Sequence, residues 1–187
     1  MERDIARSLE VLKEGGLILY PTDTIWGIGC DATDYDAVRK ILNLKKRTDM
    51  KSLLVLLDDE GKLHHYVNTI PDIAWDIRKV TDRPLTIIYP QGKNLASNLL
   101  HKDGSVGIRI VLDDFCRILI SRFGKPLVST SANISGESSP SNYREISETI
   151  KSGVDYIVQW RQEETFKAIP SGIIKLGEKG EVEIIRK

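Results

Sequence analysis

Apolar residues recur at helical spacing in several stretches of the chain. In the first stretch, Ile5, Leu9 and Leu12 lie three or four positions apart, so they fall on one side of a helix. Further along, Val38 and Ile41 continue the same pattern, and Asp34 stands before them as an N-cap residue. This spacing predicts helices at residues 4–14, from 34 onward, and at 71–80, 113–123 and 143–151.

Short apolar runs separate these helices and predict buried strands. They lie at residues 17–20, 52–57, 85–89, 105–111, 126–129, 155–159, 172–176 and 181–185. Strands and helices alternate over much of the chain, which favours a layered α/β domain over a helical bundle or a β-sandwich. The last strands have no helices between them, so we expect a mixed sheet with parallel and antiparallel parts. The length fits one domain spanning residues 1–187.

Composition narrows the class of protein. The chain is 41% apolar and 29% charged, as is usual for globular proteins, and its first residues lack the apolar core of a secretory signal. Cys30 and Cys116 lie far apart, which favours a reducing compartment, so we expect a cytoplasmic protein without membrane contact. The 27 basic and 27 acidic residues cancel, and no histidine or cysteine has metal-ligand spacing, so no protein-bound metal is expected.

Polar residues directly follow the first predicted strand. Thr22, Asp23 and Thr24 stand where an open α/β sheet places its ligand-binding groups. Gly27 and Gly29 would let a ligand or another backbone approach closely. A turn followed by a β-bulge explains the same residues without any ligand, and the sequence leaves both interpretations open.

Basic residues end the second predicted helix. Lys45 lies four residues beyond Ile41, where the buried stripe would carry another apolar residue, so its ammonium must either reach solvent or meet an anion. Arg47 adds a planar fork suited to phosphate or carboxylate. Cations at a helix C-terminus also suit the helix dipole, and the basic run from 39 to 51 also fits a solvated face.

A third polar segment, residues 129–136, follows the strand predicted at 126–129. Ser129, Ser131 and Asn133 belong to it, and their hydroxyl and amide groups suit phosphate or carboxylate oxygens. The same side chains could simply cap the next turn. There is no Walker loop and no GxGxxG motif, so the common nucleotide-binding folds are not indicated.

In order along the chain, these segments resemble the YrdC-like family of L-threonylcarbamoyladenylate synthases, in its single-domain form. The resemblance runs through GGLILYPTDTIWGIGCDA, LKKR, RPLTIIYP, VGIRI, GKPLVSTSANISG and AIPSGIIKL. It implies a twisted open mixed sheet with flanking helices around a positively charged concave cavity. It also implies that L-threonine, bicarbonate and ATP give threonylcarbamoyl-AMP and pyrophosphate, for threonylcarbamoyladenosine modification of tRNA through downstream transfer proteins.

The resemblance also implies the site residues. Lys45, Arg47, Ser131 and Asn133 would be catalytic, with Mg²⁺ accompanying the ATP. Substrate binding would fall to Thr22, Thr24, Thr86, Arg109, Ser129 and Ser171. The sequence departs from the family pattern at Trp26, Val111, Gly172 and Lys175, and the last two put the role of Ser171 in doubt.

The main alternative is a module that binds double-stranded RNA or tRNA in the same basic cavity. Zero net charge and 6% aromatic residues argue against RNA binding as the primary role. A second alternative is another carbamoyl or adenylyl transfer in the same pocket, but the Lys-x-Arg and Ser-x-Asn pairs are intact, which favours the synthase. The Ser- and Pro-rich stretch at 136–142 is the expected mobile loop.

Overall fold

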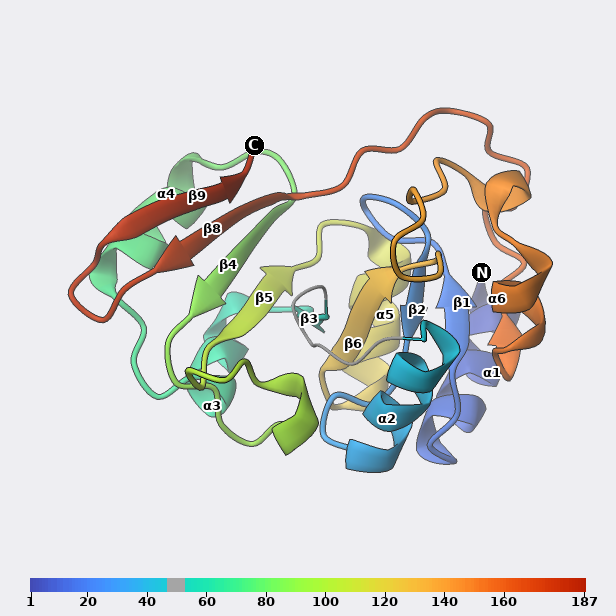
Figure 1. The fold of residues 1–187 in the computed structure, drawn as a ribbon, viewed down its shortest axis with the longest axis horizontal. Coiled ribbons are helices and arrows are strands. Elements are labelled where there is room, and N and C mark those ends of the chain that lie inside the picture. The colour runs from blue at the N-terminus through green and yellow to red at the C-terminus, as the bar shows by residue number, and fades with distance from the viewer. Residues whose placement is uncertain (47–52) are drawn as a thin grey trace.

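The computed structural model describes residues 1–46 and 53–187, and within these ranges it contains one sheet of nine strands. The sheet runs in the order β7-β1-β2-β6-β3-β5-β4-β8-β9 (Figure 1). Neighbours are parallel in the pairs β1/β7, β3/β5 and β4/β8 and antiparallel in the others, which confirms the mixed sheet. The strands are β1 (Ile18–Tyr20), β2 (Gly27–Gly29), β3 (Leu54–Leu57), β4 (Leu85–Tyr89), β5 (Val106–Ile110), β6 (Leu127–Ser131), β7 (Tyr156–Ile157), β8 (Gly172–Leu176) and β9 (Val182–Arg186).

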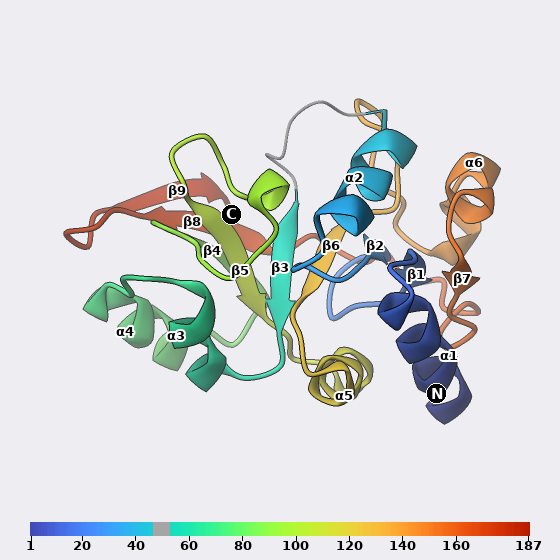
Figure 2. The same ribbon diagram turned by 90° about the horizontal axis from the view of Figure 1, so that it is seen from below.

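Helices cover both faces of this sheet. In Figure 2, α2 lies on one side and α3, α4 and α5 lie on the other, as expected for a layered α/β fold. The α-helices are α1 (Glu2–Lys13), α2 (Tyr35–Leu44), α3 (Leu63–Tyr66), α4 (Asp72–Val80), α5 (Asp114–Phe123) and α6 (Glu148–Ser152). Short 3-10 turns occupy Glu60–Lys62, Ser97–Leu99 and Tyr143–Glu145.

The first strand shows how the two faces are packed. Leu17 and Leu19 belong to the apolar cluster that includes Val38 of α2, whereas Ile18 and Tyr20 belong to the cluster formed with α1 and α5. This division follows from the two-residue period of a strand, which sends successive side chains to opposite faces. Because both faces are covered, the run reads as continuously apolar rather than alternating.

Two predicted helix boundaries are confirmed by their caps. The Asp34 carboxylate accepts hydrogen bonds from the amides of Asp36 and Ala37, as an N-cap does. Gly124 ends α5 with φ of 74°, a left-handed conformation that glycine adopts without strain.

Other boundaries differ from the sequence prediction. The helix expected at 143–151 is divided into a 3-10 turn and α6, because Ile146 between them is extended. Pro71 precedes α4 as its N-cap instead of occupying the first turn. The strand expected at 52–57 begins at Leu54, and residue 52 lies outside the described ranges.

Strand β2 has no counterpart among the predicted strands, because the sequence of this segment also fits a turn followed by a β-bulge. Its glycines are required by packing: a Cβ on Gly29 would stand 2.6 Å from Cε1 of Tyr20 and 2.8 Å from the carbonyl oxygen of Val128. The Tyr20 ring therefore lies against β2, and the carbonyl of Val128 confirms the close backbone approach expected at the glycines. The antiparallel pairs β1/β2 and β2/β6 bring the first and third polar segments together.

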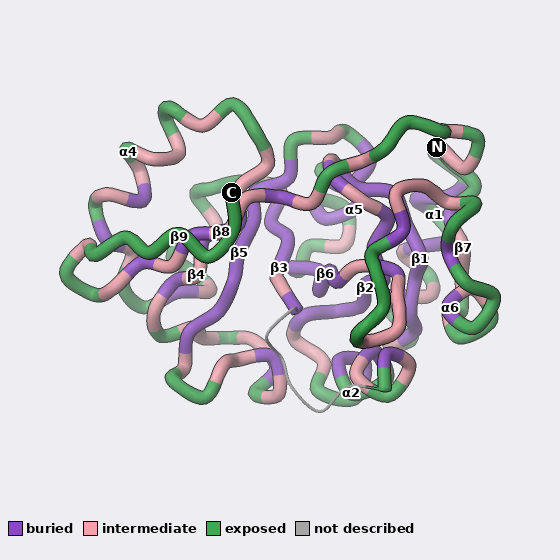
Figure 3. Tube along the Cα trace, turned by 45° about the horizontal axis from the view of Figure 1, so that its top comes forward, coloured by how far each residue is buried: buried purple, intermediate pink, exposed green. Residues whose placement is uncertain are grey.

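Burial separates the centre of the sheet from its edge. Strand β5 is buried along its length, whereas β9 at the edge is exposed throughout (Figure 3). Within the described ranges, no helix combines the length and the apolar character that crossing a membrane requires.

Candidate anion-binding pocket

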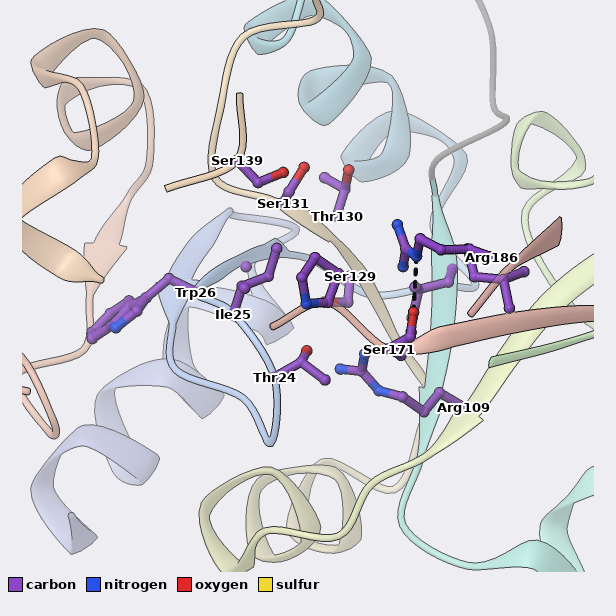
Figure 4. A pocket seen from close by; sticks show the side chains of 14 residues that line it. Thr24, Ile25, Trp26, Arg109, Ser129, Thr130, Ser131, Ser139, Ser171 and Arg186 are labelled. Carbon is purple, nitrogen blue, oxygen red and sulfur yellow. Dashed lines mark hydrogen bonds between the residues drawn. The ribbon is translucent and has the colours of Figure 1, made fainter. Parts of the chain in front are cut away.

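A pocket opens on one side of the sheet, where residues of β2, β6, β5, β8 and β9 line it. It contains about 660 Å³ of empty space, including the part open to solvent. Figure 4 shows Thr24 and Arg109 on one side, Ser131 and Ser139 on another, and Arg186 near Ser171. The described lining residues are Thr24, Ile25, Trp26, Gly27, Leu54, Arg109, Ser129, Thr130, Ser131, Ser139, Pro170, Ser171, Ile173 and Arg186. These described residues include two arginines and no carboxylate.

The first wall is the turn after β1. The Thr22 hydroxyl donates to the carbonyl of Ile25 at 2.8 Å and accepts from the amide of Thr24 at 3.0 Å, which is a Ser/Thr turn. The two threonine hydroxyls are 3.0 Å apart. Thr22 is buried beneath the wall and holds the turn, while Thr24 lines the pocket.

The second wall is Arg109, in the middle of β5 between β3 and β4. Its guanidinium forms an ion pair with Asp23 at 3.1 Å, and both side chains are almost fully buried, with 4% and 5% exposed. Burial raises the pKa of the Asp23 carboxyl, and the Arg109 charge opposes that rise. Although Arg109 is almost fully buried, it lines the pocket, so its charge acts in a poorly solvated place.

The third wall is Arg186, the last residue of β9. In the pairing with β8, Arg186 lies opposite Ile173, and Ile184 lies opposite Ile174. Ile185 is therefore an extra residue and forms a β-bulge. Residues opposite each other in an antiparallel pair lie on the same face of the sheet, so the bulge places Arg186 on the face where Ile173 lines the pocket. Without the extra residue, Arg186 would lie on the same face as Ile184. Burial, and then the nearby Arg109 charge, lower the pKa of Arg186. Two arginines that repel each other across a cavity favour an anion between them.

Ser171 connects this wall to the sheet. Its hydroxyl is 2.9 Å from that of Thr86 on β4, and its carbonyl accepts a 2.9 Å hydrogen bond from Nε of Arg186. Thr86 pairs with Arg109 in the antiparallel ladder of β4 and β5, so it lies beside the pocket without lining it. Ser171 itself lines the pocket, next to Gly172 at the start of β8.

Lys45 was expected to reach solvent or to meet an anion, and in the structure it contacts backbone carbonyls. Helix α2 ends at Leu44 and Lys45 caps it, with 1% of the residue exposed. Its ammonium donates to the carbonyl of Ser131 and, at 2.6 Å, to that of Asn133. The amide of Ser135 in turn donates to the carbonyl of Lys45 at 3.1 Å. Lys45 therefore fastens the loop after β6, and it is not among the residues that line the pocket.

The remaining predicted residues fall into three groups. Ser129 and Ser131 line the pocket from β6. Asn133 lies behind them, where its amide group donates to the carbonyls of Ile134 and Glu137 and its Oδ1 is buried without a partner among the described residues. Arg47 lies outside the described residues.

The departures from the family pattern have separate structural effects. Trp26 lines the pocket and packs on Tyr143 with ring centroids 5.1 Å apart. Val111 is buried in the cluster with α1 and α5. Lys175 pairs with Asp103 at 2.7 Å and does not line the pocket.

Sequence reasoning missed Arg186. A basic residue at the end of a terminal strand normally faces solvent, and only the bulge turns it into the pocket. Ser139 also lines the pocket. The sequence feature that pointed to it is the Ser- and Pro-rich stretch at 136–142, which predicts a mobile loop.

The fold and the pocket define a class: an α/β protein whose mixed sheet carries a pocket lined by two arginines and several hydroxyl groups. A family model, Sua5/YciO/YrdC, described as "Telomere recombination", matches residues 10–187. The chain belongs to this family. Curated relatives include the threonylcarbamoyl-AMP synthases of Pseudoalteromonas translucida, 34% identical over 82% of this chain and 84% of that protein, and of Psychromonas ingrahamii, 31% identical over 81% of each.

Solved structures agree on the fold. Escherichia coli YciO is 25% identical, covers 100% of this chain and 90% of its own, and has a TM-score of 0.85. Sua5 of P. abyssi complexed with L-threonine is 26% identical, with a TM-score of 0.84 over 94% of this chain. The chain spans 52% of that Sua5 protein, about half of its length.

Proposed function

We propose that this protein is a threonylcarbamoyl-AMP synthase, which joins L-threonine, bicarbonate and ATP into threonylcarbamoyl-AMP and pyrophosphate. The observation that carries the proposal is the pair Arg109 and Arg186 beside the hydroxyls of Thr24, Ser129 and Ser131. Relatives that carry this activity in their names are 30–34% identical over most of their length, and a neighbouring structure is titled as a complex with L-threonine.

The charges of the substrates explain why the pocket needs cations. Threonine carbamate and the triphosphate of ATP are both negative, so the carbamate oxygen approaches the α-phosphorus only where the repulsion is offset. Arg109 supplies positive charge in a poorly solvated place, Arg186 adds a second charge from the exposed edge strand, and the serine and threonine hydroxyls orient the oxygens. The described lining contains no cysteine or histidine, so the proposed catalysis depends on positioning and electrostatics rather than on a covalent intermediate.

Mg²⁺ would enter this pocket with the triphosphate. The hydroxyl groups of the lining could coordinate it, whereas the guanidinium groups could not, and the carboxylate behind the lining, Asp23, is paired with Arg109. When bound, the ion would offset phosphate charge. No cluster of metal-ligating side chains occurs among the described residues.

The finer assignments are part of the same proposal. It places the enzyme among the nucleotidyltransferases, in the cytoplasm, acting as one domain over residues 1–187. Its product would pass to proteins that transfer the threonylcarbamoyl group to tRNA. Binding of tRNA or double-stranded RNA by the protein itself stays a prediction.

The proposal is tested by pyrophosphate release from Mg-ATP with L-threonine and bicarbonate. Ser131→Ala and Arg186→Gln should lower the rate, whereas Ser121→Ala and Arg122→Gln, matched exposed residues on α5, should not. We expect Lys45→Ala and Arg47→Ala to abolish activity. Release that does not depend on threonine would overturn the substrate assignment, and full activity in both pocket variants would overturn the site.

A further inference from the structure

A buried carboxylate, Asp23, lies behind the pocket wall and does not line the pocket itself. Its side chain is 5% exposed. One carboxylate oxygen, Oδ1, lies 3.1 Å from Nη2 of Arg109, and the other, Oδ2, accepts a hydrogen bond of 3.3 Å from the amide of Leu112 just after β5. Asp23 therefore connects the turn after β1 to the strand that carries Arg109.

The contacts of Arg109 show what this carboxylate does. The contact with Asp23 is an ion pair, and Oδ1 of Asp23 has no hydrogen-bond partner among the described residues. The described hydrogen bond of the guanidinium is a long one, 3.4 Å from Nη2 to the Thr22 hydroxyl. Its Nε is buried without a hydrogen-bond partner in the part of the chain that the structure describes. Asp23 thus holds one corner of the guanidinium, while the group as a whole lies at the pocket wall (Figure 4). A flexible side chain binds an anion best when its orientation is fixed beforehand.

We propose that Asp23 is a positioning residue, which fixes the Arg109 guanidinium for a carboxylate or phosphate group of the substrate and does not touch the substrate. The inference rests on the proposed function, because it assigns Arg109 to an anionic substrate of that reaction. It also predicts that Asp23 has no effect on binding except through Arg109.

A purely structural role for Asp23 is the competing explanation, since the carboxylate also holds Leu112. Asp23→Asn keeps the shape and an acceptor for that amide but removes the charge that faces Arg109. A matched control is Asp31→Asn: Asp31 is also buried, pairs with Lys125 at 2.6 Å and lies outside the pocket lining. Both changes remove one carboxylate from an ion pair, so they separate a general loss of stability from an effect at the pocket.

The first measurement is a double-mutant cycle on KM for L-threonine and for ATP. Asp23→Asn should raise one of these KM values about tenfold or more, the size expected from misplacing a charge-assisted hydrogen bond. In the Arg109→Gln background, Asp23→Asn should add no further increase, because the residue it positions is already absent. Asp31→Asn should leave both values unchanged.

The second measurement does not depend on activity. The ¹⁵N–¹H signal of Nε of Arg109 is assigned by its loss in Arg109→Lys, and Asp23→Asn should shift or broaden it while Asp31→Asn should not. An unchanged signal, additive KM effects in the cycle, or equal KM effects of both Asn variants would overturn the proposal.

An inactive wild type would overturn the proposed function, and the Arg109 signal would still decide whether Asp23 positions the guanidinium. If Asp23→Asn alone does not fold, the double variant Asp23→Asn/Arg109→Gln, which leaves no uncompensated charge in this pair, is compared with Arg109→Gln. Equal KM values support the proposal, and a higher KM in the double variant overturns it.

Discussion

Lys45 gives the sharpest test of how the pocket is held together. The structure assigns its ammonium to the carbonyls of Ser131 and Asn133, so it supports the loop that carries a pocket serine. Lys45→Met keeps a buried unbranched side chain of similar length and removes the donor. Lys45→Ala removes the side chain as well.

The magnitude follows from what each change leaves behind. The carbonyl of Ser131 also accepts from the amide of Asn133 at 2.9 Å, so it keeps a donor, whereas the carbonyl of Asn133 has no other donor among the described residues. One buried acceptor without a partner costs about 1–3 kcal/mol, so we expect about 2 kcal/mol for Lys45→Met. Lys45→Ala also loses three buried methylenes at about 0.8 kcal/mol each, which brings its cost to about 4–5 kcal/mol.

Urea unfolding of the wild type and the two variants measures these costs, and thermal melting checks them at about 2–4 °C per kcal/mol for a chain of this size. The control is Lys13→Met, which replaces an exposed lysine in the last turn of α1 and should change stability by less than about 0.5 kcal/mol. A Lys45→Met protein as stable as the wild type would refute the assignment of the ammonium to the carbonyls.

Three further predictions concern other parts of the site and sheet. Gly29→Ala should cost about 2–3 kcal/mol in urea unfolding, because its Cβ would stand 2.6 Å from the Tyr20 ring; an unchanged midpoint would contradict this packing. Burial raises the pKa of Tyr89 to about 12, so the unfolded chain loses that proton first, near pH 10, and stability should fall by up to about 2–3 kcal/mol between pH 10 and 12. Tyr89→Phe should lose that part of the pH dependence, and an identical profile would refute it. Arg186→Gln should raise KM for ATP or L-threonine about tenfold without lowering the melting temperature, since Arg186 lies on an exposed edge strand; unchanged KM values would remove it from the site.

The fold was largely predictable because each element carries a local signal. The caps Asp34 and Gly124 and the apolar runs of β4 and β8 have clear sequence patterns, and the structure places these elements close to the predicted bounds. Strand β2 had no such signal. Gly27–Gly29 is three residues long, and its glycines are explained by the Tyr20 ring that crosses them, which is a contact between strands that no local pattern shows.

The site was predictable in part, for the same physical reason. Residues that follow strands, such as Thr24 and Ser131, could be expected at the edge of the sheet where ligands bind. Arg186 could not, because a single extra residue in β9 decides which face it occupies. The unusual place of Lys45 on an apolar stripe was visible in the sequence, but its carbonyl partners lie at the end of β6 and just after it, 86 and 88 residues further along the chain.

The central claim is that this pocket joins threonine, bicarbonate and ATP. It is tested most directly by incubating the purified protein with L-threonine, ¹³C-bicarbonate and Mg-ATP and measuring the nucleotide products by mass spectrometry. The account predicts threonylcarbamoyl-AMP that carries one ¹³C atom, formed together with pyrophosphate and absent when threonine is omitted. A protein that forms no such product, or forms adenylate without the labelled carbon, would contradict it.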